Sequence, residues 1–328
     1  MTKHVVHDDV YGTYNIHEPV LIDLLQSSAV TRLKGIHQGG SAYLVMKRRD
    51  NTRFEHSVGV MSLIRCLGGS LHEQIAGLLH DVSHTAFSHV VDYAFQLKTE
   101  DFHEQHFHQL VHNSDIPAIL SKHDIPLEIV FDHEQWSLLE QPAPDLCADR
   151  IDYTLRDMLR VGYTSSAEIQ QFLQSLVVHE GKIVTSNLSA ALWFTHLYTD
   201  LVRDVFMKPL EMFADEQLAL AIRVALAEGI LQESDLFRQD EYVLQLLRSA
   251  RHLEISRHLS NIHPGITVVE DMEHYDIRAF TKPRIVDPLV LMADGSVVRC
   301  SELEPDVKRL HDEVVQRATQ GVCIRQIP

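Results

Sequence analysis

The sequence has few cysteines and no long apolar run. Its four cysteines, Cys66, Cys147, Cys300 and Cys323, stand far apart and lack a CxxC spacing. This pattern argues against a thiolate zinc site or a disulfide framework and fits a reducing compartment. No run of about 18 apolar residues occurs, and the N-terminal MTKHVVHDDVYG lacks an apolar segment. The sequence therefore predicts no membrane span and no secretion signal, and we expect a cytoplasmic protein.

Positive charge is also scarce. The 328 residues include 29 Lys and Arg against 46 Asp and Glu, which gives a net charge of −17. Such a surface repels polyanions, which argues against nucleic-acid binding as the main role. A small anionic substrate is compatible with this balance, because a bound divalent cation and a few basic side chains can invert the field inside one cleft.

The spacing of apolar residues predicts a mainly α protein. From about residue 18 to residue 260 they recur at helical intervals, which predicts helices over 19–26, 57–69, 72–82, 90–97 and, with a break at Pro209, 188–229. After about residue 260, β-branched runs alternate up to residue 300, and Ala293-Asp294-Gly295 is typical of a hairpin turn. A last helix is expected over 304–320. We therefore expect a helical core over residues 1–260 and a small α+β lobe over 261–328.

Histidine is abundant, with 22 residues and a dense group between His80 and His112. The stretch LLHDVSHTAFSH, residues 78–89, holds three of these histidines and Asp81. Neutral imidazole is the commonest metal ligand in proteins and also an acid or base near neutral pH. The histidine content therefore raises the prospect of a metal site without locating it.

His80 and Asp81 come at the end of an expected helix, as the first candidate metal ligands. Adjacent helical residues point about 100° apart, so both reach one ion only if other helices supply further ligands. His56 in RFEHSVGVMSLI and Asp149 in LCADRIDYTLRD are the candidates. Two imidazoles and two carboxylates suit a divalent ion such as Mn, Mg, Fe, Zn or Ni, with positions left for water or a substrate oxygen.

This combination resembles the HD-domain metal-dependent phosphohydrolases, which are named for the His-Asp pair. The closest similarity is to the SAM-and-HD-domain dNTP triphosphohydrolase and dGTPase-like subfamily, without the SAM domain. The matching blocks run from residue 9 to residue 157 in the family's order and include NTRFEHSVGV, IAGLLHDVSHTAFSH, FHEQH and ADRIDYTLRD. The resemblance implies an HD-domain helical bundle-like core and agrees on His56, His80, Asp81 and Asp149 as metal ligands.

The resemblance also implies catalytic roles for the histidines. His84 would contact a substrate phosphate, although capping of the helix end is an alternative role. His89 and Asp92, three residues apart, suit an imidazole oriented by a carboxylate, and His89 is the candidate general acid. His103 would sit against the leaving oxygen, supported by its neighbour Glu104. His106, His108 and His112 have no such match, and we expect them on a solvated face.

Substrate-binding roles follow from the same resemblance. Arg53 and Arg150 would bring positive charge to the metal cleft, with Arg150 at a position where the animal enzyme has a lysine. Gln38 and Asp157 would contact the sugar 3′-hydroxyl, and Tyr153 would disfavour a 2′-hydroxyl, unless it is simply a core aromatic. Arg203 fits as a phosphate contact, whereas Phe206 stands in place of the family's base-stacking tyrosine.

Three functions are consistent with this sequence. The first is a metal-dependent hydrolase that converts a dNTP to a deoxynucleoside and triphosphate. The second is a nucleoside monophosphate phosphatase or other phosphomonoesterase that uses the same site, and the third is a non-catalytic nucleotide-binding regulatory module. We expect a small-molecule nucleotide as the ligand and a homo-oligomer, a dimer or higher. The sequence leaves open the metal, the base, the number of phosphates, any allosteric regulation and the role of residues 261–328.

Overall fold

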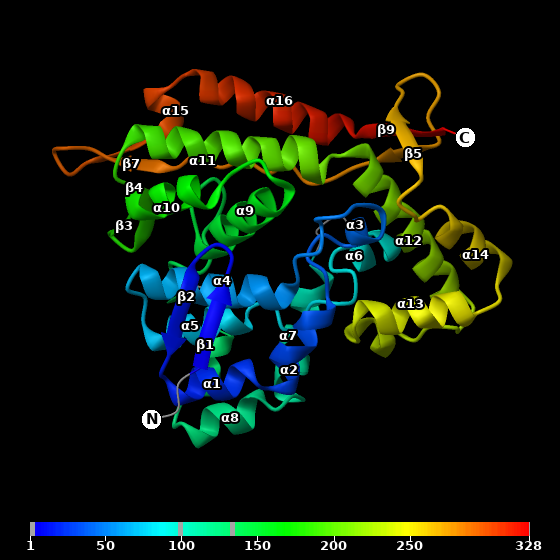
Figure 1. Cartoon of the computed structure of the whole chain (residues 1–328), viewed down its shortest axis with the longest axis horizontal. Coiled ribbons are helices and arrows are strands. Elements are labelled where there is room, and N and C mark those ends of the chain that lie inside the picture. Colours follow the sequence, from blue (N-terminus) through cyan, green and yellow to red (C-terminus); the bar gives the residue numbers. More distant parts are fainter. Residues whose placement is uncertain (1–3, 98–100, 132–134, 328) are drawn as a thin grey trace.

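Helices account for most of the structure, a computed structural model that describes residues 4–97, 101–131 and 135–327 (Figure 1). The mainly α class is therefore confirmed. None of the helices in these ranges has the length and apolar character needed to cross a membrane. The helices of the N-terminal half are α1 (Pro19–Leu25), α2 (Ser28–Arg32), α3 (Ala42–Val45), α4 (Arg53–Cys66), α5 (Leu71–Leu79), α6 (Val90–Ala94), α7 (Phe102–His112), α8 (Ile116–Lys122) and α9 (Ala148–Val161), with short 3₁₀ turns at Leu33–Gly35 and Leu127–Val130.

Helices α4, α5 and α9 pack together in the larger of the two main apolar cores of the described residues, beside which a third, small cluster surrounds Val290 and Cys300. A capping box fixes the start of α4: Thr52 accepts a hydrogen bond from the Glu55 backbone, and the Glu55 carboxylate accepts one from the Thr52 backbone. Gly59 lets α9 approach α4 closely, because a β-carbon there would collide with the Asp152 carboxylate. α9 ends at Gly162, which has a left-handed φ of 86°. The ends of these helices carry the residues of the site described below.

A second apolar core lies where α6 packs on the later helices. Leu218 and Ile222 of α12 pack there with Val243 and Leu247 of α13. Pro209 starts α12 after an extended Lys208, as the sequence predicted. The chain before this break is a π-helix rather than an α-helix. The elements of this half are α10 (Ser166–Ser175), α11 (Leu188–Asp200), the π-helix (Leu201–Phe206), α12 (Pro209–Ala227), a 3₁₀ turn (Glu233–Phe237), α13 (Asp240–Ser249), α14 (Leu253–Ser260), α15 (Cys300–Leu303) and α16 (Asp306–Gln320).

The strands of the described ranges form three small sheets. β1 (His4–Asp8) and β2 (Gly12–Ile16) make an N-terminal hairpin that the periodicity did not predict. β3 (Leu176–His179), β4 (Lys182–Thr185), β7 (Leu289–Leu291) and β8 (Val297–Arg299) form the second sheet, with β4 and β7 parallel. The predicted turn at 293–295 joins β7 to β8. β5 (Thr267–Glu270), β9 (Val322–Ile327) and β6 (Ile277–Ala279) form the third.

Residues 261–327 are distributed over two sheets and share the core of the preceding chain. β7 pairs with β4, whereas β5, β6 and β9 pack on α12. Helix α16 runs along α11 (Figure 1). Val314 and Ile324 belong to the larger apolar core. This placement brings the C-terminal chain next to the helices that carry the site.

The predicted helix boundaries differ most near the histidine-rich stretch. The sequence predicted one helix over 72–82, but α5 ends at Leu79 and His80 to Ser83 form a turn. His84 therefore does not follow His80 on a continuous helix, as the spacing argument assumed. The helix expected over 90–97 also ends early, at Ala94. The turn matters because it directs His80 and His84 toward the same cavity from different backbone directions.

Candidate metal centre and active-site cavity

Four side chains from three separate segments converge in the middle of the molecule. His56 lies in the first turns of α4, His80 and Asp81 follow the end of α5, and Asp149 lies in the first turn of α9. The His56 Nε2 atom is 3.0 Å from Asp149 Oδ1 and 3.7 Å from Asp81 Oδ2. The His80 Nε2 atom is 3.5 Å from Asp81 Oδ1 and 3.6 Å from Asp149 Oδ1. The structure thus brings together all four residues predicted as metal ligands.

The orientation of both imidazoles fits a metal ion. His56 donates its Nδ1–H to Asp152 at 2.8 Å, and His80 donates its Nδ1–H to the Gly77 carbonyl at 2.7 Å. Each ring therefore turns Nε2 toward the carboxylates. The Nε2 atom of His80 is buried and makes no hydrogen bond within the described part of the chain. A buried nitrogen without a partner, facing two carboxylates and a second imidazole, is the donor set expected for a divalent cation.

The electrostatics of this group favour a cation at its centre. Burial raises the pKa of Asp81, but Arg53, His80 and His84 together outweigh this effect and hold the pKa well below its usual range. Burial also opposes ionisation of Asp149, whereas the hydrogen bond with His56 and the nearby His80 imidazole lower its pKa. For His56, burial lowers the pKa, but hydrogen bonds to Asp149 and Asp152 raise it to about 10. Asp81, Asp149 and Asp152 are balanced here by Arg53, Arg156 and a protonated His56, and a divalent ion bound at this point would take the place of the His56 proton, because a ligating imidazole is neutral.

A large cavity of about 830 Å³ opens on this centre. Its size is within the usual range for pockets that bind small molecules. Predicted site residues that line it are Gln38, Arg53, His80, Asp81, His84, His89, His103, Glu104, Asp149, Arg150, Tyr153 and Asp157. His56 and Asp92 lie behind the lining side chains, where His56 faces Asp149 and Asp92 contacts His89.

Three predicted catalytic histidines form a cluster beside the metal ligands. The rings of His84 and His103 stack with their centroids 3.7 Å apart, and His89 lies edge-on to both. His84 Nε2 is 3.3 Å from Asp81 Oδ1. Burial and the Arg53 charge hold the pKa of His84 well below its usual range. Burial and the His89 charge lower the pKa of His103 to about 3, so both stacked rings are neutral near pH 7.

His89 differs from the other two because a carboxylate orients it. Its Nδ1–H donates to Asp92 at 3.0 Å, and 30% of its side chain is exposed. Asp92 also accepts the backbone N–H of Phe102. A carboxylate at Nδ1 favours the protonated ring and leaves Nε2 to face the cavity. This geometry supports the predicted pairing of His89 with Asp92.

Glu104 does not support His103 in the way the sequence suggested. It is exposed, and it makes no hydrogen bond to His103 within the described residues. Adjacent residues of α7 point about 100° apart, so the two side chains leave the helix in different directions. Of the histidines expected on a solvated face, His108 and His112 are exposed and His106 is half-buried against Phe102.

The two predicted cations of the metal cleft are already engaged. Arg53 donates to Asp81 at 2.8 Å and to Ser88 Oγ at 3.0 Å. The Arg150 guanidinium turns back onto the preceding loop, where it contacts Cys147 Sγ at 3.2 Å and the Glu140 carboxylate at 3.5 Å. Glu140 and Cys147 also lie within ligand range of Asp149. Because the Arg150 guanidinium already contacts Glu140 and Cys147, we assign no second ion to this group.

The predicted sugar-contacting residues all line the cavity. Gln38 has a buried Oε1 with no hydrogen-bond donor among the described residues. Tyr153 pairs its hydroxyl with that of Tyr198 at 2.9 Å. Asp157 accepts from Asn51 at 2.8 Å and forms an ion pair with Arg49 at 3.0 Å. A sugar hydroxyl at Asp157 would therefore share its carboxylate with these two partners.

Sequence reasoning missed several buried polar residues of the site. Asp152 had a usable signal, because it lies three positions after Asp149 and therefore close to it on the α9 surface. No sequence signal indicated Arg49, because its partners Asp157 and Glu211 come from distant parts of the chain. Burial raises the pKa of Glu211 to about 7 and that of Asp215 to about 6. Both carboxyls line the cavity beside Gln38.

Arg203 is the predicted site residue that the structure places elsewhere. Its guanidinium pairs with Asp200 at 2.6 Å and with Asp204 at 2.7 Å, and 46% of its side chain is exposed. It does not line the cavity, whereas the nearby Phe206 does. The π-helix changes the direction in which side chains leave this segment, so an alignment by spacing misplaces Arg203.

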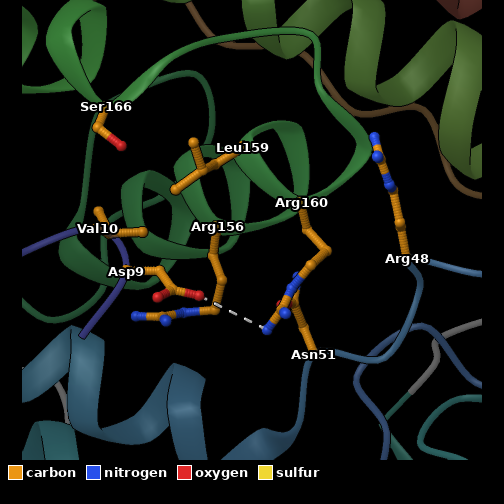
Figure 2. Close-up of a pocket in the computed structure, with 8 residues that line it drawn as sticks. All are labelled: Asp9, Val10, Arg48, Asn51, Arg156, Leu159, Arg160 and Ser166. Carbon is orange, nitrogen blue, oxygen red and sulfur yellow. Dashed lines mark hydrogen bonds and ion pairs between the residues drawn. The ribbon is translucent and has the colours of Figure 1, made fainter. Parts of the chain in front are cut away.

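A second, smaller cavity of about 320 Å³ lies against another side of α9 (Figure 2). Arg48, Arg156 and Arg160 line it together with Asp9, and Asp9 pairs with Arg160. Asn51 connects the two cavities: it accepts from Arg160 at 2.9 Å and donates to Asp157. The arginines other than Arg48 are paired with carboxylates here, so we assign no ligand to this cavity.

Comparisons with known proteins agree on one family. The family model described as HD domain matches residues 53–157. An uncharacterized protein of Bacillus subtilis, YdhJ, is 44% identical over 321 residues and covers 98% of each chain. The metal-dependent phosphohydrolase cns2 of Cordyceps militaris is 34% identical over 292 residues, covering 87% of this chain and 84% of cns2.

Two further comparisons extend this result. The deoxynucleoside triphosphate triphosphohydrolase SAMHD1 of Danio rerio is 29% identical over 230 residues, which cover 54% of this chain and 37% of SAMHD1. The crystal structure of a phosphohydrolase from Bacteroides thetaiotaomicron superposes with a TM-score of 0.74 at 17% identity, covering 98% of this chain and 99% of that one. At this identity, the second similarity supports the fold alone.

Proposed function

The chain belongs to the HD-domain metal-dependent phosphohydrolases, and we propose that within this family it hydrolyses deoxynucleoside triphosphates to a deoxynucleoside and triphosphate. One observation carries the proposal. A single cavity is lined by three of the four predicted metal ligands (His80, Asp81 and Asp149), by the carboxylate-oriented His89 and by the polar residues Gln38, Tyr153 and Asp157. A nucleotide with its α-phosphate at the metal ligands could reach both the histidine cluster and these polar residues. The similarity to SAMHD1 supports this substrate class.

In the proposed reaction, a water oxygen bonds to the α-phosphorus and the bond from this phosphorus to O5′ breaks. The leaving O5′ takes up a proton, and the attacking water loses one. His56, His80, Asp81 and Asp149 would hold a divalent cation, which supplies Lewis-acid activation of the phosphate and of water. Arg53 and the neutral His84 lie beside Asp81, where they can donate to phosphate oxygens as negative charge develops.

In this proposal, His89 donates the proton to the leaving O5′. Asp92 holds the His89 Nδ1–H, which favours the imidazolium and points Nε2 into the cavity. The stacked His84 and His103 stay neutral and can donate or accept a single hydrogen bond without adding charge. An alkoxide such as O5′ is a poor leaving group unless it is protonated. A positioned imidazolium can supply this proton as the bond between phosphorus and O5′ breaks.

The phosphomonoesterase activity is kept as a second candidate because of one observation. Arg203, which the resemblance assigned to a phosphate, lies outside the cavity and pairs with two aspartates. A site without this contact is compatible with a substrate that carries one phosphate. The same metal ligands and the same His89 would then release orthophosphate. The expectations of a homo-oligomer and of a cytoplasmic location stay predictions from the sequence.

A product-resolved nucleotide screen tests the proposal. Purified protein would be incubated with each dNTP, each rNTP and each dNMP in the presence of Mn²⁺ or Mg²⁺, and the products separated by ion-exchange chromatography. We expect triphosphate and free deoxynucleoside in equal amounts from at least one dNTP, and none with Asp81→Ala. Orthophosphate from dNMPs with intact dNTPs would favour the second candidate. Unchanged nucleotides throughout would contradict both.

A further inference from the structure

The segment of residues 281–285 brings the C-terminal chain into the active-site cavity. It connects β6 to β7 and lines the cavity with Thr281, Lys282, Pro283, Arg284 and Ile285. The segment carries two cations, Lys282 and Arg284, that the family resemblance did not cover. The role of residues 261–328, which the sequence left open, can therefore be sought at the active site.

Hydrogen bonds fix the end of this segment to three parts of the fold. The Val286 carbonyl accepts from His311 of α16 at 2.9 Å, and Val286 itself is buried in the larger core. The Asp287 backbone N–H donates to the Pro144 carbonyl at 2.9 Å, and its carboxylate accepts from the Ser301 hydroxyl at 2.6 Å. The segment is therefore held beside the cavity before any ligand binds, which reduces the entropy cost of using its side chains.

The two cations face different ends of the metal-binding region. Arg284 lies over the Phe206 ring at 5.9 Å, and its charge acts on the hydroxyls of Tyr153 and Tyr198. Lys282 lies at the exposed rim, where its charge acts on the carboxyls of Asp92 and Glu104. Between them they extend positive charge along the cavity from the histidine cluster to the tyrosine pair.

The charges on the rest of the cavity wall favour a phosphate chain near Lys282 and Arg284. At the end near Gln38, Asp157 and Glu211 share the guanidinium of Arg49 and Asp215 accepts from Ser41, so the carboxyls outnumber the cation there. Arg150 is bound to its own loop and Arg203 lies outside. A chain of phosphates would be repelled by the carboxyl end and attracted toward Lys282 and Arg284.

We propose that Lys282 and Arg284 hold the phosphates beyond the α-phosphate and so make the enzyme prefer a triphosphate over a monophosphate. This inference rests on the proposed function for the position of the α-phosphate at the metal ligands. It assigns to the C-terminal segment the role that sequence similarity assigned to Arg203. The ligand class is a linear polyphosphate group, whether carried by a nucleotide or free.

Binding of inorganic phosphates tests this without hydrolysis of a nucleotide. Titration calorimetry would use protein purified with its metal, with orthophosphate, pyrophosphate and triphosphate as ligands. We expect triphosphate to bind more tightly than orthophosphate. Lys282→Gln and Arg284→Gln should each weaken triphosphate binding on the order of 10-fold, since a hydrogen bond to a charged group contributes about 1.5 kcal/mol or more. Orthophosphate affinity should change less than triphosphate affinity.

Two further variants complete the design. Lys308→Gln removes one positive charge from an exposed position on α16 that is not part of the cavity lining, and it should leave triphosphate binding unchanged. Arg203→Gln tests the rival assignment and should also have no effect. Thermal unfolding would show that every variant is folded. The proposal is overturned if the Lys282 and Arg284 variants keep the wild-type preference, if Arg203→Gln abolishes it, or if wild type shows no preference for triphosphate.

The outcome is separable from that of the proposed function. If no dNTP is hydrolysed but triphosphate binding depends on Lys282 and Arg284, the proposed reaction fails and the polyphosphate site stands. If dNTPs are hydrolysed and both variants bind triphosphate as wild type does, the reaction stands and the polyphosphate site fails.

Discussion

His56 Nδ1 lies 2.8 Å from the carboxylate of Asp152, which is 96 residues later in the chain. The contact fixes the tautomer of His56 and turns its Nε2 toward Asp149. Both side chains are fully buried, and Arg156 holds the other side of the same carboxylate at 2.9 Å. Asp152 therefore positions a predicted metal ligand without being predicted as a ligand itself.

Replacing Asp152 should weaken metal binding. In Asp152→Asn, the carboxylate that orients and polarises His56 is lost, so we expect the affinity for Mn²⁺ to fall on the order of 10- to 100-fold. Calorimetric titration of metal-free protein would measure it. Asp8→Asn is the matched control, since Asp8 also pairs with Arg156 but does not touch His56. Equal metal affinity in wild type and Asp152→Asn would show that this contact has no influence on the ion.

Removal of the metal should destabilise the protein as well as inactivate it. A ligand that binds only the folded state stabilises it by about 2.7 kcal/mol at 100 times its Kd. We therefore expect the Tm to fall on chelation and to rise again as divalent metal is added back. Asp81→Ala removes one ligand and should lose this response in a thermal-shift titration. A Tm that rises equally in wild type and Asp81→Ala would place the ion at another site.

His89→Gln should slow hydrolysis according to the leaving group. If His89 protonates O5′, the variant should lower kcat on the order of 100- to 10,000-fold for a nucleotide substrate. The p-nitrophenyl ester of a deoxynucleoside 5′-phosphate would be affected far less, because nitrophenolate leaves without a proton. Steady-state kinetics on both substrates would measure the difference, with His112→Gln on the exposed face of α7 as control. An equal loss for both substrates would remove His89 from the role of acid.

Stability should depend on pH through the buried carboxyl of Glu211. Burial raises its pKa from 4.5 to about 7 against the Arg49 charge. The folded protein thus binds more protons than the unfolded chain between these values, and the free energy of unfolding falls as the pH rises from about 4.5 to about 7. The expected loss from this group is about 3 kcal/mol. Urea unfolding at pH 5 and pH 8 should show a smaller pH dependence for Glu211→Gln, and an unchanged dependence would contradict the assignment.

The helical framework was largely predictable because its signals are local. Periodic apolar residues and the break at Pro209 indicated the main helices, and Ala293-Asp294-Gly295 indicated the β7–β8 turn. The hairpin of β1 and β2 and the pairing of β4 with β7 were not predicted. Strand pairing joins residues far apart in the chain, and short strands carry too few residues for their periodicity to stand out.

The sequence by itself determined the chemical identity of the centre. Two histidines and two aspartates, each at or near a helix end, suffice to indicate a divalent cation, since few other arrangements need those residue types together. The tertiary structure decided which charged groups face the cavity. Arg203 turns toward Asp200 and Asp204, while Lys282 and Arg284 reach the cavity from the C-terminal segment. The direction of a long side chain depends on the packing and charges around it, and these come from residues distant in the sequence.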